Sequence, residues 1–300
     1  MNSIATSPAL EALVARGDKV LVTGADGFLG SHLVAEFRRR GVSVIAVSRK
    51  VGIDILVDNL PLEGVRHVFH LAGRTFVPDS WNDPSGFHLT NTHGTVRVLD
   101  QCRQHGCSVS FASTYVYGKP DYIPIDEQHP VRAWTPYTFS KIASEEACRF
   151  FSETFGLPVK ILRIFNIYGP GQNTRFLIPS IVEQVIDTSR AQVEVQDLSP
   201  KRDYVYVTDV VDAFLATMDL PGFVIFNVGS GKSYSVEQII RLVCVAASAQ
   251  KAFRAIGVRR PNEVDDVVAN IAALQLAAGW TPQTSLRDGI QQCVASMAPR

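Results

Sequence analysis

The sequence lacks the features that would place this chain in a membrane, in an oxidising compartment or on nucleic acid. Its 300 residues contain no apolar run long enough to span a bilayer, and Met1–Gly17 has neither the basic start nor the long apolar core of a secretory signal. The 29 Lys and Arg residues balance 29 Asp and Glu residues, so no general affinity for nucleic acid is predicted. Only five cysteines occur, without metal-ligand or redox spacing. We therefore expect a cytoplasmic protein with reduced thiols and no metal site.

Internal repeats and low-complexity tracts are also missing, whereas strand and helix patterns alternate along the chain. Short β-branched apolar runs predict strands, and the segments between them have helical periodicity. The predicted strands are Lys19–Thr23, Val42–Val47, Val65–Leu71, Ser108–Ser113 and Val159–Phe165. This alternation predicts an α/β fold with a Rossmann-type, doubly wound parallel sheet that helices cover on both faces. The length allows one large domain and a smaller C-terminal substrate-binding lobe.

A glycine-rich turn joins the first predicted strand to a helix. Gly24, Gly27 and Gly30 follow the strand with the spacing Gly-x-x-Gly-x-x-Gly, and Ser31–Arg40 has the pattern of an amphipathic helix. Glycines at such a turn let the backbone approach a pyrophosphate, whose charge is met by free N–H groups and the helix dipole. A turn without a ligand is the alternative, but the strand before it and the helix after it favour a dinucleotide site.

Ser48, Arg49 and Lys50 follow the second predicted strand, where dinucleotide-binding folds distinguish between cofactors. An acid at this point holds the ribose 2′-hydroxyl, whereas a nearby arginine accommodates a 2′-phosphate. No acid is present at residues 48–50, so NADP(H) is favoured and NAD(H) is the alternative. Arg49 and Lys50 could equally be solvated loop charges.

Tyr137 and Lys141 are four residues apart, which puts them on one face of a helix. A tyrosine titrates near pKa ~10, and a neighbouring ammonium would lower this pKa toward the range useful for acid–base catalysis. The same spacing also occurs in ordinary surface helices. Ser113 ends the fourth predicted strand, at the edge where open α/β sheets bind ligands, and its hydroxyl can donate to a substrate carbonyl.

Taken together, these motifs resemble the short-chain dehydrogenase/reductase superfamily, and more narrowly its extended branch of nucleotide-sugar epimerases, dehydratases and ketoreductases. The resemblance starts from the glycine turn, from Ser113 with Val116-Tyr117-Gly118 downstream, and from Tyr137-x-x-x-Lys141. It covers nearly the whole chain from about Lys19 onward. Further signatures are His70–Gly73, Asn91 with Gly94-Thr95, Arg163–Gly171, Arg202–Val210, Phe226–Gly231, Arg260-Pro261 and Gly279–Pro282.

The resemblance implies Ser113, Tyr137 and Lys141 as the catalytic residues. Tyr137 would take or give the proton of a sugar oxygen, Ser113 would hydrogen-bond that oxygen, and Lys141 would hold the nicotinamide ribose. The implied cofactor contacts are Gly24, Asp26, Gly27, Phe28, Leu29, Ser48, Arg49, Lys50, Asp54, Ile55, Leu71, Ala72, Gly73, Tyr137 and Lys141. Asp54 and Ile55 stand for an acidic-aliphatic pair that touches adenine. The chain before them is shorter than in the family, which opens this pocket and leaves Asp58 as an equally plausible surface acid.

The implied substrate is a nucleotide-diphosphate sugar, linked to UDP, dTDP, GDP or CDP. Its predicted contacts are Thr114, Tyr115, Asn166, Arg202 and Arg260. The two arginines would clamp the diphosphate, because guanidinium binds phosphate oxygens bidentately. The resemblance also implies a homodimer and two domains. Residues 15–167 and 203–229 would bind the dinucleotide, and residues 168–202 and 230–300 would bind the nucleotide sugar.

Three reactions at such a site remain open. A 4,6-dehydratase is disfavoured, because Thr114 and Tyr115 occupy the positions of its Asp-Glu acid–base pair. A 4-epimerase would oxidise and re-reduce C4 with retained NAD, whereas a 4-ketoreductase would use exchangeable NADPH. Arg49, Lys50 and a more open adenine pocket favour the ketoreductase. A dinucleotide-binding regulator without catalysis is the alternative from another class, and the intact catalytic set argues against it.

Overall fold

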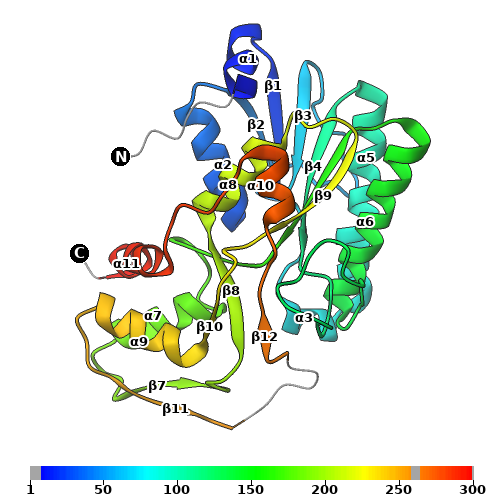
Figure 1. The fold of residues 1–300 in the computed structure, drawn as a ribbon. Coiled ribbons are helices and arrows are strands. Elements are labelled where there is room, and N and C mark those ends of the chain that lie inside the picture. Colours follow the sequence, from blue (N-terminus) through cyan, green and yellow to red (C-terminus); the bar gives the residue numbers. More distant parts are fainter. Residues whose placement is uncertain (1–7, 258–263, 299–300) are drawn as a thin grey trace.

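A six-stranded parallel sheet forms the centre of the computed structural model, which describes residues 8–257 and 264–298 (Figure 1). The strand order is β2-β1-β3-β4-β5-β9, and every neighbouring pair is parallel. The strands are β1 (Lys19–Thr23), β2 (Ser43–Val47), β3 (Val65–His70), β4 (Ser108–Thr114), β5 (Val159–Ile164) and β9 (Phe223–Val228). The predicted α/β class is therefore confirmed, and the five predicted strands match the observed bounds to within one residue at either end.

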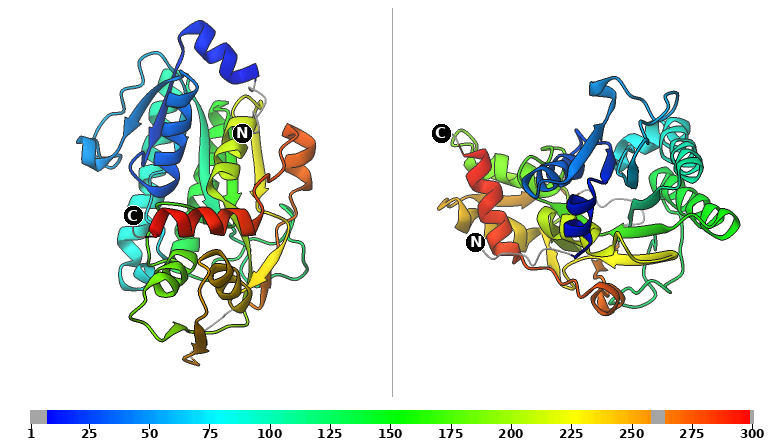
Figure 2. Two further views of the ribbon diagram at one scale, coloured as in Figure 1. Left: turned by 90° about the vertical axis from the view of Figure 1, so that its left-hand side faces the viewer. Right: turned by 90° about the horizontal axis from the view of Figure 1, so that it is seen from above.

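Helices cover both faces of this sheet, as Figure 2 shows from above. On one face α2 (Phe28–Arg39) packs beside α8 (Val207–Thr217), and on the other α5 (Gly94–His105) packs beside α6 (Pro136–Phe155). Leu33 and Phe37 of α2 are fully buried in the same apolar cluster as Val20 and Val22 of β1. No helix within the described ranges is long and apolar enough to cross a membrane.

The other helices associated with the large sheet are shorter. They are α1 (Pro8–Arg16), the 3-10 turn η1 (Arg49–Val51), α3 (Val77–Asn82), α4 (Pro84–His88), the π-helical turn η2 (Leu89–His93) and α10 (Ala272–Ala278).

A smaller lobe follows the carboxyl ends of β5 and β9, below the large sheet in Figure 1. Its elements are β6 (Asn166–Tyr168), α7 (Leu177–Ile186), β7 (Gln192–Val195), β8 (Lys201–Tyr206), β10 (Ser233–Ser235), α9 (Val236–Ala246), β11 (Ala252–Ala255), β12 (Asp266–Val267) and α11 (Leu286–Met297). Strand β8 pairs with β6, β10 and β12, and β7 pairs with β11. Helix α11 contacts α7, α9 and β8, and lies between this lobe and the sheet in the left view of Figure 2.

Asp203 fixes the connection between the two lobes. This fully buried side chain accepts backbone N–H groups from Ser230 at 2.6 Å, Gly231 at 2.9 Å and Ala269 at 3.0 Å. Burial raises the pKa of Asp203, and the same backbone donors act in the opposite direction. The chain that leaves the large sheet after β9 is thereby attached to β8 of the smaller lobe.

Candidate active site

The glycine turn after β1 is shaped to bring backbone close to a bound anion. Gly24 has a φ of +67°, and a Cβ atom there would lie 2.7 Å from the Ala72 nitrogen. A Cβ atom on Gly30 would collide with the carbonyl oxygen of Gly24. Helix α2 starts at Phe28 with Gly27 as its N-cap and no side-chain cap, so the N–H groups of its first turn have no helical acceptor. These features fit a pyrophosphate.

The segment after β3 is held against this turn. Thr23 Oγ1 accepts the N–H groups of Leu71 and Ala72, each at 3.2 Å, and Thr23 also hydrogen-bonds His70 at 2.8 Å. Burial lowers the pKa of His70 to about 3, so this histidine is neutral and structural. The predicted cofactor residues at 71–73 therefore lie beside the glycine turn, as the sequence indicated.

Asn91, in the π-helical turn η2, fixes the other side of the same segment. Its amide oxygen accepts the Arg74 N–H at 2.8 Å, and its amide nitrogen donates to the Arg74 carbonyl at 3.0 Å and to Ser140 Oγ at 2.9 Å. A Cβ atom on Gly73 would lie 3.0 Å from the Asn91 amide oxygen. Asn91 thus couples the segment at residues 71–74 to α6.

The end of β2 continues into η1, which carries two exposed cations. Lys50 Nζ lies 3.5 Å from Asp26 Oδ2 in the glycine turn. Asp54 and Asp58 form a local turn, in which Asp58 accepts the Asp54 N–H at 2.7 Å and Asp54 accepts the Leu56 N–H at 3.0 Å. Ile55 is buried in the core that includes α5. Asp54 and Ile55 therefore have structural contacts in addition to the predicted contact with adenine.

Tyr137 and Lys141 are both buried on one face of α6, as their spacing predicted. The helix starts with a capping box between Thr135 and Thr138 and with Pro136 in its first turn, which fixes Tyr137 in that turn. Lys141 Nζ donates to the Ala112 carbonyl of β4 at 2.7 Å and lies 3.9 Å from the centre of the Phe111 ring. The ammonium is thus anchored on β4.

Tyr137 is a neutral phenol in this arrangement. Burial raises its pKa to about 12, a hydrogen bond with Thr114 lowers it, and the proximity of Tyr115 raises it. The prediction that Lys141 lowers the pKa of Tyr137 is wrong here, because the ammonium is directed to the Ala112 carbonyl and does not contribute to the shift. Burial also lowers the pKa of Lys141 to about 8.

Ser113 has a partner that the sequence did not predict. Its hydroxyl donates to Glu145 Oε1 at 2.5 Å, and both side chains are buried. Glu145 in turn accepts Arg163 Nη2 at 2.6 Å and Arg163 Nε at 3.1 Å. Ser113 therefore belongs to a buried ionic network with Glu145 and Arg163. The hydroxyl that interacts with the Tyr137 phenol comes from the adjacent Thr114.

Glu145 and Arg163 were not among the predicted site residues. The signal for Glu145 was present, because it follows Lys141 by four residues and extends the helix face that bears Tyr137. Arg163 lies opposite Ser113 in the pairing of β4 with β5, and its Nη1 donates to the Tyr117 hydroxyl at 3.0 Å. Tyr117 donates to Asn227 Oδ1 at 2.6 Å, which extends the network to β9.

The predicted substrate residues lie where the large sheet meets the smaller lobe. The Tyr115 ring stacks on Phe165 with 5.6 Å between ring centres. Asn166 on β6 donates to the Asp203 carbonyl at 3.3 Å. Arg202 on the neighbouring β8 donates from Nη1 to the carbonyls of Lys201 at 2.8 Å and Val264 at 2.7 Å. The predicted residue Arg260 lies outside the described residues.

Comparison with known proteins places this geometry in context. The sequence profile of the NAD dependent epimerase/dehydratase family matches residues 20–229. The chain is 29% identical over 298 residues to the GDP-6-deoxy-D-mannose reductase of Pseudomonas aeruginosa, which covers 94% of this chain and 98% of the relative. It is 30% identical over 306 residues to a UDP-glucose 4-epimerase of Halalkalibacterium halodurans, with 88% and 90% covered. Among solved structures, RMD from Pseudomonas aeruginosa complexed with NADPH superposes with a TM-score of 0.87 at 28% identity, over 93% of this chain and 98% of that one.

Proposed function

The chain belongs to the NAD dependent epimerase/dehydratase family, and we propose that it reduces a ketone at C4 of a nucleotide-diphosphate sugar with NADPH. The predicted resemblance is confirmed, and so is the prediction that the chain is an enzyme, which removes the alternative of a regulator without catalysis. Its relatives include both a reductase and an epimerase, so the choice between these reactions rests on the site itself.

The observation that carries the proposal is the pairing of a buried, protonated Tyr137 with the hydroxyl of Thr114. Reduction of a ketone needs a proton donor for the oxygen that becomes a hydroxyl. The Tyr137 phenol is protonated at neutral pH and can supply this proton, although burial raises its pKa to about 12. Thr114 and Tyr115 provide no carboxylate at the positions where a dehydratase needs its acid–base pair. Both features favour reduction.

The backbone at residues 24–30 fits a nicotinamide dinucleotide. We propose that Gly24, Asp26, Gly27, Phe28 and Leu29 hold its pyrophosphate, because the glycine turn brings backbone N–H groups to an uncapped helix start. Leu71, Ala72 and Gly73 would form the adjoining wall of this site. When bound, NADPH supplies the hydride.

The protein's own residues supply the proton and the positioning. In our proposal Tyr137 donates its phenolic proton to the substrate oxygen, and Thr114 stabilises the resulting phenolate by donating a hydrogen bond. Lys141, anchored on the Ala112 carbonyl, contributes a positive charge beside the reaction centre and a donor for the cofactor ribose. Ser113 donates a hydrogen bond to Glu145 and thereby attaches the end of β4 to α6.

We propose that the smaller lobe binds the nucleotide sugar. Asn166 and Arg202 lie on adjacent strands and would contact the diphosphate together with Arg260, since amide and guanidinium groups both donate to phosphate oxygens. The sequence-based division gave residues 15–167 and 203–229 to the dinucleotide and residues 168–202 and 230–300 to the sugar nucleotide. Because β6 and β8 lie in the smaller lobe, we assign residues 166–167 and 203–206 to the part that binds the sugar nucleotide.

A 4-epimerase with retained NAD is the second candidate. The 30% identity to a UDP-glucose 4-epimerase supports it, and one tyrosine can serve oxidation and reduction at the same carbon. Tyr137 would act as base and then as acid in such an epimerase. The absence of an acidic residue at 48–50 favours NADPH over a retained NAD and therefore supports the reductase.

The test is to mix the purified protein with NADPH and a nucleotide-linked 4-keto-6-deoxyhexose and to follow the nicotinamide absorbance. We expect stoichiometric oxidation of NADPH, and a loss of about 100-fold or more in kcat for Tyr137→Phe, which removes the proton donor. The epimerase proposal would replace the reductase proposal if NADPH is not oxidised, NAD is tightly bound to the purified protein, and the protein interconverts 4-epimeric sugars.

We also propose a homodimer formed through α6. Phe139, Phe150 and Phe155 of this helix are 56%, 55% and 47% exposed, which is unusual for large apolar rings on one element. Light scattering of the wild type should give twice the mass of the chain. Phe150→Glu should give the monomer mass.

A further inference from the structure

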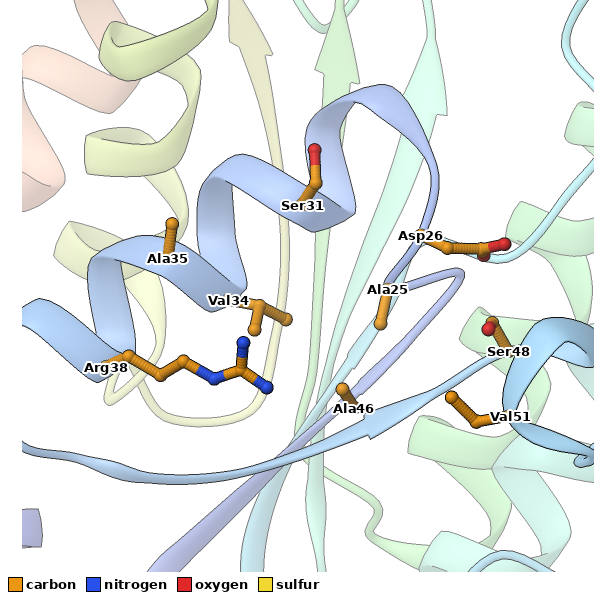
Figure 3. A pocket seen from close by; sticks show the side chains of 9 residues that line it. All are labelled: Ala25, Asp26, Ser31, Val34, Ala35, Arg38, Ala46, Ser48 and Val51. Carbon is orange, nitrogen blue, oxygen red and sulfur yellow. The ribbon is translucent and has the colours of Figure 1, made fainter.

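A cavity of about 210 Å³ lies between α2, along its length from Ser31 to Arg38, and the end of β2 (Figure 3). Ala25 and Asp26 of the glycine turn form one wall, and Ala46 and Ser48 of β2 and its end form another. A water molecule occupies roughly 30 Å³ in the liquid, so the cavity holds several waters or one phosphate monoester. It adjoins the proposed pyrophosphate turn and the strand end where dinucleotide folds place the adenosine ribose.

Arg38 is the cationic residue that α2 places in this cavity. Figure 3 shows its side chain running from the helix toward Ala46 of β2. The two following arginines have another partner, because Arg39 binds Glu36 through two contacts of 2.7 Å and Arg40 binds the same carboxylate at 2.5 Å. Within the described parts of the chain, no ion pair or side-chain hydrogen bond is found for the Arg38 guanidinium. It is therefore available to an anion in the cavity.

The remaining polar groups of the cavity make it suitable for a phosphate. Ser48 is buried and its hydroxyl makes no capping bond to η1, so it faces the cavity as a donor. Asp26 would repel an anion, but Lys50 Nζ lies 3.5 Å from its Oδ2 and offsets that charge. Of the charged residues, Arg38 and Asp26 line the cavity, and Lys50 reaches it only through its contact with Asp26.

Dinucleotide folds place the 2′-phosphate of NADP at this strand end, and we infer that its principal ligand in this chain is Arg38 of α2, rather than Arg49 or Lys50. This inference rests on the proposed use of NADPH. It differs from the sequence-based prediction, which assigned the phosphate to Arg49 and Lys50 after β2. In the structure Lys50 offsets the charge of Asp26, and the guanidinium that enters the cavity comes from α2. Guanidinium suits this ligand because it donates two parallel hydrogen bonds to phosphate oxygens.

The test uses two probes that differ by one phosphate, 2′,5′-ADP and 5′-AMP, and neither needs a sugar substrate. Their dissociation constants are measured by calorimetry for the wild type, Arg38→Gln and the matched control Arg39→Gln. Arg38→Gln should weaken 2′,5′-ADP about 10-fold and change 5′-AMP less than about twofold, since one charge-assisted contact is lost. Arg39→Gln, whose side chain binds Glu36, should change neither. Asp26→Asn should tighten 2′,5′-ADP.

The possible results distinguish the role of Arg38 from the use of NADPH. A selective loss of 2′,5′-ADP binding in Arg38→Gln supports the assignment. A wild type that prefers 2′,5′-ADP while Arg38→Gln leaves both probes unchanged, or weakens both equally, overturns the role of Arg38 but not the use of NADPH. A wild type that binds 5′-AMP as tightly as 2′,5′-ADP overturns both the phosphate site and the proposed cofactor. The sugar reduction assay could fail while 2′,5′-ADP still binds more tightly than 5′-AMP and Arg38→Gln removes that preference. This result would support Arg38 as the phosphate ligand and refute only the proposed reduction.

Discussion

The hydroxyl of Ser113 donates to the Glu145 carboxylate across 2.5 Å, and this contact joins the end of β4 to the middle of α6. Glu145 is also bound by Arg163, which lies opposite Ser113 on β5. Thr114, the last residue of β4, is the neighbour whose hydroxyl lowers the pKa of the Tyr137 phenol on the same helix.

We predict that Thr114→Val impairs catalysis more than Ser113→Ala. The first change removes the hydroxyl that contacts the phenol and should lower kcat for ketone reduction about 10- to 100-fold, with KM for the sugar nearly unchanged. Ser113→Ala should lower kcat less than about threefold and cost about 2 kcal/mol of stability, because a hydrogen bond to a buried carboxylate is lost. Thr114→Ser restores the hydroxyl and should recover most of the activity. If Ser113→Ala lowers kcat more than Thr114→Val does, the hydroxyl that assists Tyr137 belongs to Ser113 and not to Thr114.

Glu145→Gln should destabilise the protein strongly, because it leaves Arg163 as a buried charge without its carboxylate. The two side chains are 5% and 4% exposed, and loss of one partner from such a pair costs about 3 to 5 kcal/mol. Glu146→Gln is the matched control, since this neighbouring residue is 67% exposed and its contact with Arg149 is long, at 3.9 Å. Urea denaturation of both variants measures the difference. Equal stability of the two variants would show that the buried network contributes little.

The sheet and the position of the catalytic helix could be predicted because local patterns determine them. Alternation of apolar strands with helical segments gave five strands, and the four-residue spacing placed Tyr137 and Lys141 on one buried face. Glycine spacing also indicated the close approach at Gly24, which follows from a steric limit on the backbone. These features depend on residues that are near each other in the sequence.

The contacts of the site could not be predicted, because they depend on residues far apart in the chain. The partner of Ser113 is 32 residues away, and the Arg163 contact joins two strands of the assembled sheet. The pKa of Tyr137 depends on burial, which spacing does not give, and the direction predicted from Lys141 was wrong. Arg38 has the pattern of a solvent-facing helix residue, and its cavity exists only once α2 packs on β2.

Gly30→Ala should weaken nucleotide binding. The added methyl group would collide with the carbonyl of Gly24 and lie 2.9 Å from Ala25 Cα, so the turn itself has to move. We expect at least a roughly 10-fold loss of NADPH affinity and a stability loss of about 1 to 3 kcal/mol. Gly106→Ala is the control, because its φ of +68° makes the substitution strained while no atom lies within 4 Å of the new methyl group. An unchanged affinity in Gly30→Ala would remove the turn from the proposed site.

The pH dependence of the enzyme should follow Lys141. Burial lowers the pKa of this lysine to about 8, with Cys148 and Glu145 acting in the opposite direction. The ammonium is therefore present below about pH 8 and is lost above it, so kcat/KM for NADPH should be level at low pH and fall as the pH rises through 8. Lys141→Met should have low activity without this decline. A wild-type profile that stays level to pH 10 would contradict the assignment.

Stability should change in the opposite direction over the same pH range. Between pH 8 and about 10.5 the unfolded state still binds the Lys141 proton while the folded state has released it, so the free energy of unfolding rises with pH. Below pH 8 both states are protonated, and the buried charge keeps its full cost. Urea denaturation of the wild type and Lys141→Met at pH 7 and pH 9.5 isolates this lysine, because the other titrating groups are common to both proteins. The wild type should gain stability relative to the variant at the higher pH. A relative loss would mean that the folded protein stabilises the charged form of Lys141, and the role of burial in setting its pKa would then be wrong.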